Sequence, residues 1–195
     1  MIGANYSDKI GEDFDLEKFS LEYKESNLDT YSKSARTTFL PDYKLDNNSE
    51  RTGNNDKKTF NFNTDASLAI DKFTNITFST DYSNNTTDNT SENSVFTLRD
   101  DVLLNSSQSS SRGTAVANVF KPQIGLVRTF EKPNRSLSAS VSNTFSENKN
   151  TDYILQETLF YQTPERNDYR NQLSQNTNAT NLFRANIKYF KSGFP

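Results

Sequence analysis

The sequence predicts an all-β fold, an antiparallel meander of about seven long strands. The first observation behind this prediction is an alternation of apolar and polar side chains, which is clearest over 60–70 and recurs over 76–83 and 137–145. Successive side chains of a strand point to opposite faces, so each of these segments has one apolar and one polar face. The second observation is that the expected connections between strands are short and long in turn.

The first two expected strands flank a compact turn that contains Gly11. The first covers about 2–8. The second starts at Phe14 and fades into polar residues near Ser32. The apolar face of the second strand is formed by Phe19, Leu21 and Tyr23.

Two tight hairpins are expected further along the chain. The third and fourth strands, 57–70 and 75–83, meet across a short turn at 71–74. The fifth strand, 114–130, meets the sixth across 131–134, where proline fixes φ and asparagine tolerates a left-handed position.

The turn at 131–134 also fixes a register. It places Ile124 opposite Val141, so that the apolar side chains of the fifth and sixth strands share one face. The sixth strand starts at Arg135 and continues to about 161 beyond a polar break, and the seventh covers 183–189.

Polar tracts rich in Asn, Ser, Asp and Gly separate the hairpins, and we expect them to be long connections. They lie near 46–56, 84–94, 105–113 and 163–178. Tight turns on one side and long loops on the other are typical of an outer-membrane barrel. The meander is therefore expected to be part of a transmembrane β-barrel wall, with the turns at 9–13, 71–74 and 131–134 on the periplasmic side.

Composition excludes several classes of protein. Only 32% of the 195 residues are hydrophobic, and Asn, Ser and Thr make up 69 of them, a composition that by itself indicates disorder. The strict alternation argues for order, and a barrel with a wet lumen needs only one apolar band. A net charge of −3 with mixed signs gives no nucleic-acid footprint. The chain has no cysteine or histidine and no apolar run of about twenty residues, which excludes disulfides, a Ser-His-Asp triad and a transmembrane helix.

The apolar positions of the strands are the candidate functional residues. We expect a lipid-facing band formed by Phe60, Phe62, Leu68, Ile76, Phe78, Ile124, Leu126, Leu137, Val141, Phe183 and Ile187. Aromatic residues of the same strands could alternatively form a platform for stacking sugars: Phe60, Phe62, Phe78, Tyr82, Phe145 and Tyr189. Their place on apolar strand faces favours a lipid-facing band with an aromatic girdle.

Two acidic motifs can each be interpreted either as a functional site or as ordinary loop structure. The segment 88–92 offers oxygen atoms at alternate positions, as a calcium loop would, but it lacks the central glycine and the distal glutamate. Asp100 and Asp101 could supply one half of an acid–base pair, yet no partner carboxylate is fixed by the sequence. We expect 88–92 to be a solvated loop, and Asp100 and Asp101 to lie in a loop or at a strand end. The sequence therefore predicts no catalytic residue, no metal site and no cofactor.

The segments 3–6 and 14–16, the hairpin 130–140 and the pair Asn171–Gln172 resemble the barrel of outer-membrane proteins related to TonB-dependent receptors, particularly the Bacteroidota-type group. The resemblance spans nearly the whole chain in style and order, without a catalytic signature. It implies a place in the cell outer membrane, in a protein that takes up or binds a ligand. It also implies a plug domain and TonB-type energy-coupling machinery as partners.

We expect residues 1–195 to be a partial outer-membrane β-barrel domain. The first six residues read as a strand entered in the middle, with no signal peptide, and the last five read as a turn. Seven strands is an odd number, whereas single-chain bacterial barrels have an even one. The plug, the signal peptide and the remaining strands would then lie outside this chain.

The sequence thus favours a barrel-wall segment of a TonB-dependent-receptor-like protein. The alternative is a soluble extracellular β-sheet module with an adhesive or binding role, because soluble sheets also alternate apolar and polar side chains. An enzyme is not expected, since no nucleophile and base can be assembled from the residues present.

Overall fold

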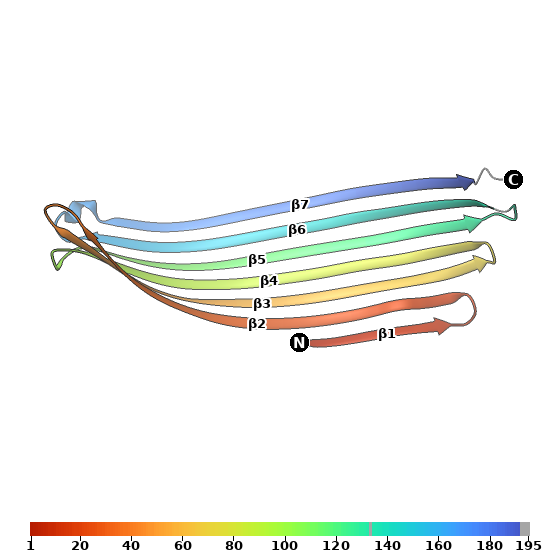
Figure 1. The fold of residues 1–195 in the computed structure, drawn as a ribbon, viewed down its shortest axis with the longest axis horizontal. Coiled ribbons are helices and arrows are strands. Elements are labelled where there is room, and N and C mark those ends of the chain that lie inside the picture. The colour runs from red at the N-terminus through yellow and green to blue at the C-terminus, as the bar shows by residue number, and fades with distance from the viewer. Residues whose placement is uncertain (133, 192–195) are drawn as a thin grey trace.

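The computed structural model describes residues 1–132 and 134–191, which form one seven-stranded antiparallel sheet in the order β1-β2-β3-β4-β5-β6-β7 (Figure 1). Every strand pairs with its neighbours in the sequence, so the predicted meander is confirmed. The sheet is open, because β1 and β7 form its two edges and do not pair with each other. The elements are β1 (Ile2–Ile10), β2 (Phe14–Phe39), β3 (Lys44–Asp71), β4 (Thr74–Arg99), β5 (Val102–Thr129), β6 (Arg135–Phe160), a 3₁₀ turn η1 (Pro164–Arg166) and β7 (Asp168–Lys191).

The prediction of long connections is wrong. The tracts 46–56, 84–94 and 105–113 lie inside β3, β4 and β5, and only the first part of 163–178 is a connection, since β7 starts at Asp168. These tracts stay in the sheet because their polar side chains bond across it in addition to the backbone ladder. The side-chain amide of Asn84 donates to Asn118 at 2.6 Å, and the hydroxyls of Ser107 and Thr158 lie 3.1 Å apart.

All connections are therefore short, and several use backbone conformations that the sequence indicates. Gly11 has φ 74° in the β1–β2 turn, and Asn134 has φ 61°, the left-handed position expected of it. The β4–β5 turn consists of Asp100 and Asp101, both with positive φ, as a two-residue hairpin turn requires. Pro133, in the predicted 131–134 turn, and residues 192–195, in the predicted terminal turn, lie outside the described residues.

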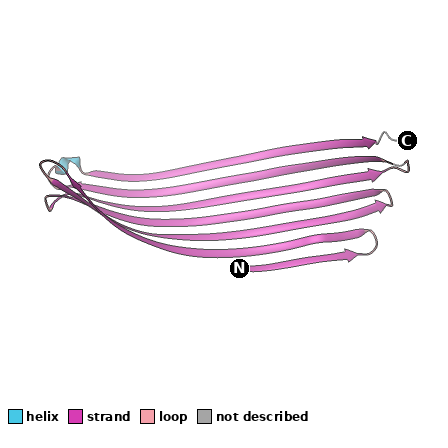
Figure 2. Cartoon of the chain, in the orientation of Figure 1, coloured by secondary structure: helices cyan, strands magenta, loops and turns pink. Residues whose placement is uncertain are grey.

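The sheet is a single layer, as the side-by-side strands of Figure 2 show. Within the part of the chain that the structure describes, no hydrophobic side chain is buried, and 30 large hydrophobic residues are exposed by at least 36%. No described helix is long and apolar enough to cross a membrane. An apolar face without a covering layer is thus the main feature that a function has to explain.

Candidate membrane-facing surface

One face of the sheet collects the apolar side chains of all the long strands. Residues that pair directly in antiparallel strands share a face, and the register pairs Leu68 with Ile76, and Phe78 with Ile124. It also pairs Ile124 with Val141, as the sequence predicts. The same register places on this apolar face all eleven predicted residues: Phe60, Phe62, Leu68, Ile76, Phe78, Ile124, Leu126, Leu137, Val141, Phe183 and Ile187. Their contact with lipid remains a prediction.

The apolar residues of this face are concentrated near the turns at 72–73 and 130–134, in a stretch that we call the apolar segment. On β4 it runs from Thr74 to Asn84, a length within the roughly 9–11 residues with which a tilted strand crosses a bilayer. Beyond Asn84 the same face of β4 carries Thr86, Asp88, Thr90 and Glu92. This polar segment continues to Arg99, about 50 Å further along the strand at 3.3 Å per residue, and Phe96 and Leu98 lie on the same face near its far end.

A row of aromatic side chains crosses the sheet where the apolar segment meets the polar one. Tyr23 pairs with Phe60, and Phe120 pairs with both Tyr82 and Phe145, so the row spans β2 to β6. The ring centroids of Phe60 and Tyr82 are 6.0 Å apart, and those of Phe120 and Phe145 are 6.2 Å apart. The hydroxyl of Tyr23 donates to Glu25, on the polar side of the row, at 3.3 Å.

A second aromatic group lies at the other end of the apolar segment, beside the short turns. Phe130 and Tyr189 have ring centroids 6.3 Å apart, and the N–H of Thr129 donates to the carbonyl oxygen of Phe73 at 2.9 Å. Two aromatic groups thus bracket the apolar segment, the arrangement of the girdles of a membrane barrel. The sequence reading missed Phe120 and Phe130 as members, although extending the predicted β5–β6 register by four residues pairs Phe120 with Phe145.

The opposite face of the same strands is polar. On β6 it presents the hydroxyls of Ser138, Ser140 and Ser142, next to Asn186 and Arg184 of β7. On β3 the side-chain amide of Asn61 donates to the Glu22 carboxylate of β2 at 3.2 Å. The two faces therefore differ sharply over the apolar segment and resemble each other beyond it.

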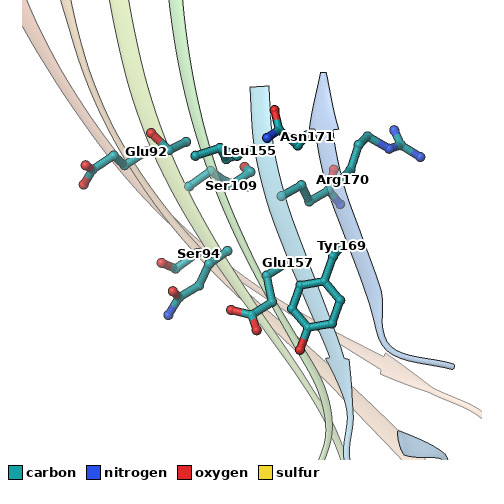
Figure 3. A pocket seen from close by; sticks show the side chains of 12 residues that line it. Glu92, Ser94, Ser109, Leu155, Glu157, Tyr169, Arg170 and Asn171 are labelled. Atoms are coloured by element: carbon teal, nitrogen blue, oxygen red, sulfur yellow. The ribbon is translucent and has the colours of Figure 1, made fainter. Parts of the chain in front are cut away.

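The polar segment contains a shallow hollow near the β6–β7 connection (Figure 3). Its volume is about 570 Å³, and its lining comes from β4, β5, β6 and β7. Glu157 and Tyr169 are cross-strand partners there, and the carboxylate of Glu157 raises the pKa of the Tyr169 hydroxyl by accepting its hydrogen bond. Glu92 and Arg170 extend to opposite sides of the group in Figure 3, so these two charged side chains do not converge in the hollow.

One lysine joins the β2–β3 turn to the β4–β5 turn, at the outer end of the polar segment. The backbone N–H of Lys44 donates to Asp100 at 2.9 Å, and its ammonium group lies 2.9 Å from Asp46 and 3.0 Å from Asp101. Hydrogen bonds to Asp46 and Asp101 raise the pKa of Lys44. The pKa of Asp46 is lowered, first by the hydroxyl of Thr37 and then by Lys44. Asp100 and Asp101 thus serve the turn structure.

The segment 88–92 is not a loop. It lies inside β4, where Asp88, Thr90 and Glu92 point to one face and the residues between them to the other. Asp88 accepts a hydrogen bond from the Thr114 hydroxyl at 2.7 Å. Over residues 1–132 and 134–191, no group of three acidic, histidine or cysteine side chains is placed to hold a metal ion.

Comparison of this chain with protein-family models and with curated proteins finds no match. The two-zone face, apolar over one segment and polar beyond it, is consequently the feature on which a functional assignment rests. Such a face is suited to contact with hydrocarbon over the apolar segment and with water over the polar segment.

Proposed function

We propose that this chain forms part of the wall of an outer-membrane β-barrel related to TonB-dependent receptors. One observation carries the proposal: apolar side chains are concentrated on one face over a segment of transmembrane length, which is bracketed by aromatic residues at both ends. An outward apolar face and an inward polar face over the same residues are what a barrel wall needs. An antiparallel meander can cross a bilayer where its strands are paired on both sides, as β3, β4, β5 and β6 are.

The exposed side chains of the apolar segment give the energetic argument. Ile187 is 76% exposed, Phe183 64% and Ile124 54%. Transfer of such a side chain from water to hydrocarbon is favourable by roughly 1.5–3 kcal/mol. Five of the eleven residues of the predicted band are exposed by at least 36%, and together they favour a hydrocarbon environment over water.

The partners of the wall follow from its edges and from the resemblance. Outer-membrane lipid would cover the apolar face, and further barrel strands would pair with the free edges of β1 and β7. In the parent protein a plug domain would fill the lumen, and TonB-type machinery would act through that plug. The parent would take up or bind a ligand at the cell surface.

A nitroxide scan of β4 tests this proposal. The chain has no cysteine, so each introduced cysteine carries a label at one known position. In neutral detergent micelles, oxygen accessibility from Thr74 to Asn84 should alternate, high at even positions and low at odd ones. From Thr86 to Glu92 the alternation should vanish, because both faces are in water there.

The same scan addresses the soluble alternative. A soluble adhesive module would not associate with the micelles, and its labels would show water accessibility along the whole of β4. Alternation that continued to Glu92 at full amplitude would also contradict the proposal, since a bilayer cannot accommodate that length of strand.

The proposal predicts an orientation for the turns. Those at 11–13, 72–73 and 130–134 adjoin the apolar segment and should face the periplasm, whereas those at 40–43, 100–101 and 161–167 end the polar segment and should face the exterior. Trypsin added to intact cells that display the protein should therefore cut at Arg166 and spare Lys72, which lies in the β3–β4 turn and is followed by Phe73. Cleavage at Lys72 in intact cells would reverse the orientation.

A further inference from the structure

A basic hollow lies at the turn end of the apolar segment. It has a volume of about 440 Å³ and lies between the β3–β4 turn and the β5–β6 turn. Its lining combines aromatic rings with three cations and one carboxylate: Phe73, Arg128, Thr129, Phe130, Glu131, Lys132, Arg135 and Tyr189. The hollow therefore combines an excess of positive charge with the aromatic group that ends the apolar segment.

The register brings the cations onto the apolar face itself. Arg128 pairs with Leu137, which places it diagonally across from Arg135 on the neighbouring strand, at about 7–8 Å. Arg135 pairs directly with Lys191 of β7. Like charges placed opposite each other are unfavourable in a sheet. Three strands thus bring positive charge to one spot.

Protein carboxylates compensate this charge only in part. Among the described residues, the ion pairs include none of Arg128, Arg135 and Lys191. Asp71 faces Arg128, but its two oxygens already accept the Phe73 N–H at 2.7 Å and the Thr74 hydroxyl at 3.2 Å. The pKa of Asp71 is lowered mainly by the Phe73 N–H, and the charge of Arg128 contributes less. The remaining carboxylate, Glu131, lines the hollow beside three cations.

An anion with an apolar tail fits both properties of the site. Guanidinium groups bind phosphate oxygens with paired hydrogen bonds. The Tyr189 hydroxyl adds a further donor. Leu137, which pairs with both Arg128 and Tyr189, begins the apolar surface on which an acyl chain would lie. A free anion would leave that adjoining surface uncovered.

We propose that this hollow binds the phosphate headgroup of an anionic phospholipid, with Arg128 and Arg135 as the main phosphate ligands. The inference rests on the proposed function, because it takes the aromatic group around Tyr189 as the level of the lipid headgroups. It adds a defined lipid site, which a uniform lipid-facing band does not require. The turn that carries the hollow is the one assigned to the periplasmic side.

The test compares the wild-type chain with two double variants that each lose two positive charges. The site variant is Arg128→Gln with Arg135→Gln. The matched control is Arg184→Gln with Lys188→Gln, on the polar face of β7, where these residues pair with Ser142 and Ser138 of β6. Native mass spectrometry of the full chain in neutral detergent micelles measures the affinity for added phosphatidylglycerol and phosphatidylcholine.

The wild-type chain should prefer phosphatidylglycerol, and the site variant should bind it about thirtyfold more weakly, as expected for two basic groups at a membrane surface. The control variant should keep the wild-type affinity. Equal affinity of the wild-type chain and the site variant would overturn the phosphate site and leave the barrel-wall proposal standing.

Two further outcomes are decisive. Displacement of bound phosphatidylglycerol by inorganic phosphate at equal concentration would identify a free anion as the occupant and overturn the lipid assignment. Failure of the wild-type chain to associate with neutral micelles would overturn the lipid site together with the proposed function. Circular dichroism of each variant checks that the sheet has formed.

Discussion

A positive charge in the middle of the apolar segment should destabilise the membrane-embedded sheet by about 2–4 kcal/mol. Val141→Arg is the cleaner of two substitutions, because Val141 is 46% exposed and pairs with the apolar Ile124 and Ala185. Phe62→Lys should have a similar effect, and it also removes a ring contact with Phe19, whose centroid lies 5.5 Å away. The cost arises because hydrocarbon cannot solvate the charge.

The matched control for this prediction is Asn63→Lys. Asn63 follows Phe62 directly in β3 and lies on the polar face, where a lysine would remain in water. Urea unfolding of the chain in detergent micelles gives the free energy of unfolding of each variant. Equal losses for Asn63→Lys and Val141→Arg would show that the two faces have the same environment and would contradict the barrel-wall proposal.

The isolated 195-residue chain should not form a stable pore. Its sheet has two unpaired edges, β1 and the 24-residue β7, and every residue of both strands is exposed. Hydrocarbon offers no partner for the N–H and C=O groups of such an edge, and each unsatisfied group costs several kcal/mol. In water the uncovered apolar face should drive aggregation.

Conductance and solution behaviour both check this second prediction. Planar bilayers exposed to the refolded chain should show no steady single-channel steps, and the chain should be monodisperse only in detergent. Steady steps from a monomer would mean that the edges meet. A soluble monodisperse species without detergent would favour the soluble extracellular module.

The sequence contains the apolar half of this fold in readable form. Alternation over 60–70 and 76–83 places the hairpin at the correct turn, and the proline and asparagine of 131–134 set the register that pairs Ile124 with Val141. Both inferences use side chains that differ between the two faces of a strand. Such a difference is a direct consequence of strand geometry and needs no knowledge of the rest of the sheet.

The polar half could not be read in the same way. Asn, Asp and Gly are depleted in strands, so tracts such as 46–56 and 84–94 indicate loops by composition. When both faces are polar, the alternation that marks a strand is also absent. What holds these tracts in the sheet is the neighbouring strand, through contacts such as the Thr59 hydroxyl to Asn85 at 2.8 Å. These partners are far apart in sequence and are revealed only by the register.

The aromatic row of the candidate site can likewise be predicted only in part from single strands. Alternation within single strands already predicts Tyr82 and Phe145 as members of an aromatic girdle. Phe120 joins them only when β4, β5 and β6 are aligned. The basic hollow is likewise assembled by alignment, since Arg128 and Arg135 belong to different strands. Single-strand patterns identify faces, whereas pairing identifies sites.

The contrast between the two zones also determines how the chain tolerates insertions. In the apolar segment, one added residue would rotate Phe60 or Ile76 to the polar face and bring a polar neighbour to the apolar face. Only the insertion of two residues in the same strand would preserve the pattern. In the polar segment a shift by one residue exchanges Asn or Ser for similar groups, as along Asn84 to Asn89. Register there is weakly specified by side chains. The long polar hairpins therefore inherit their alignment from the apolar segment and from the turns.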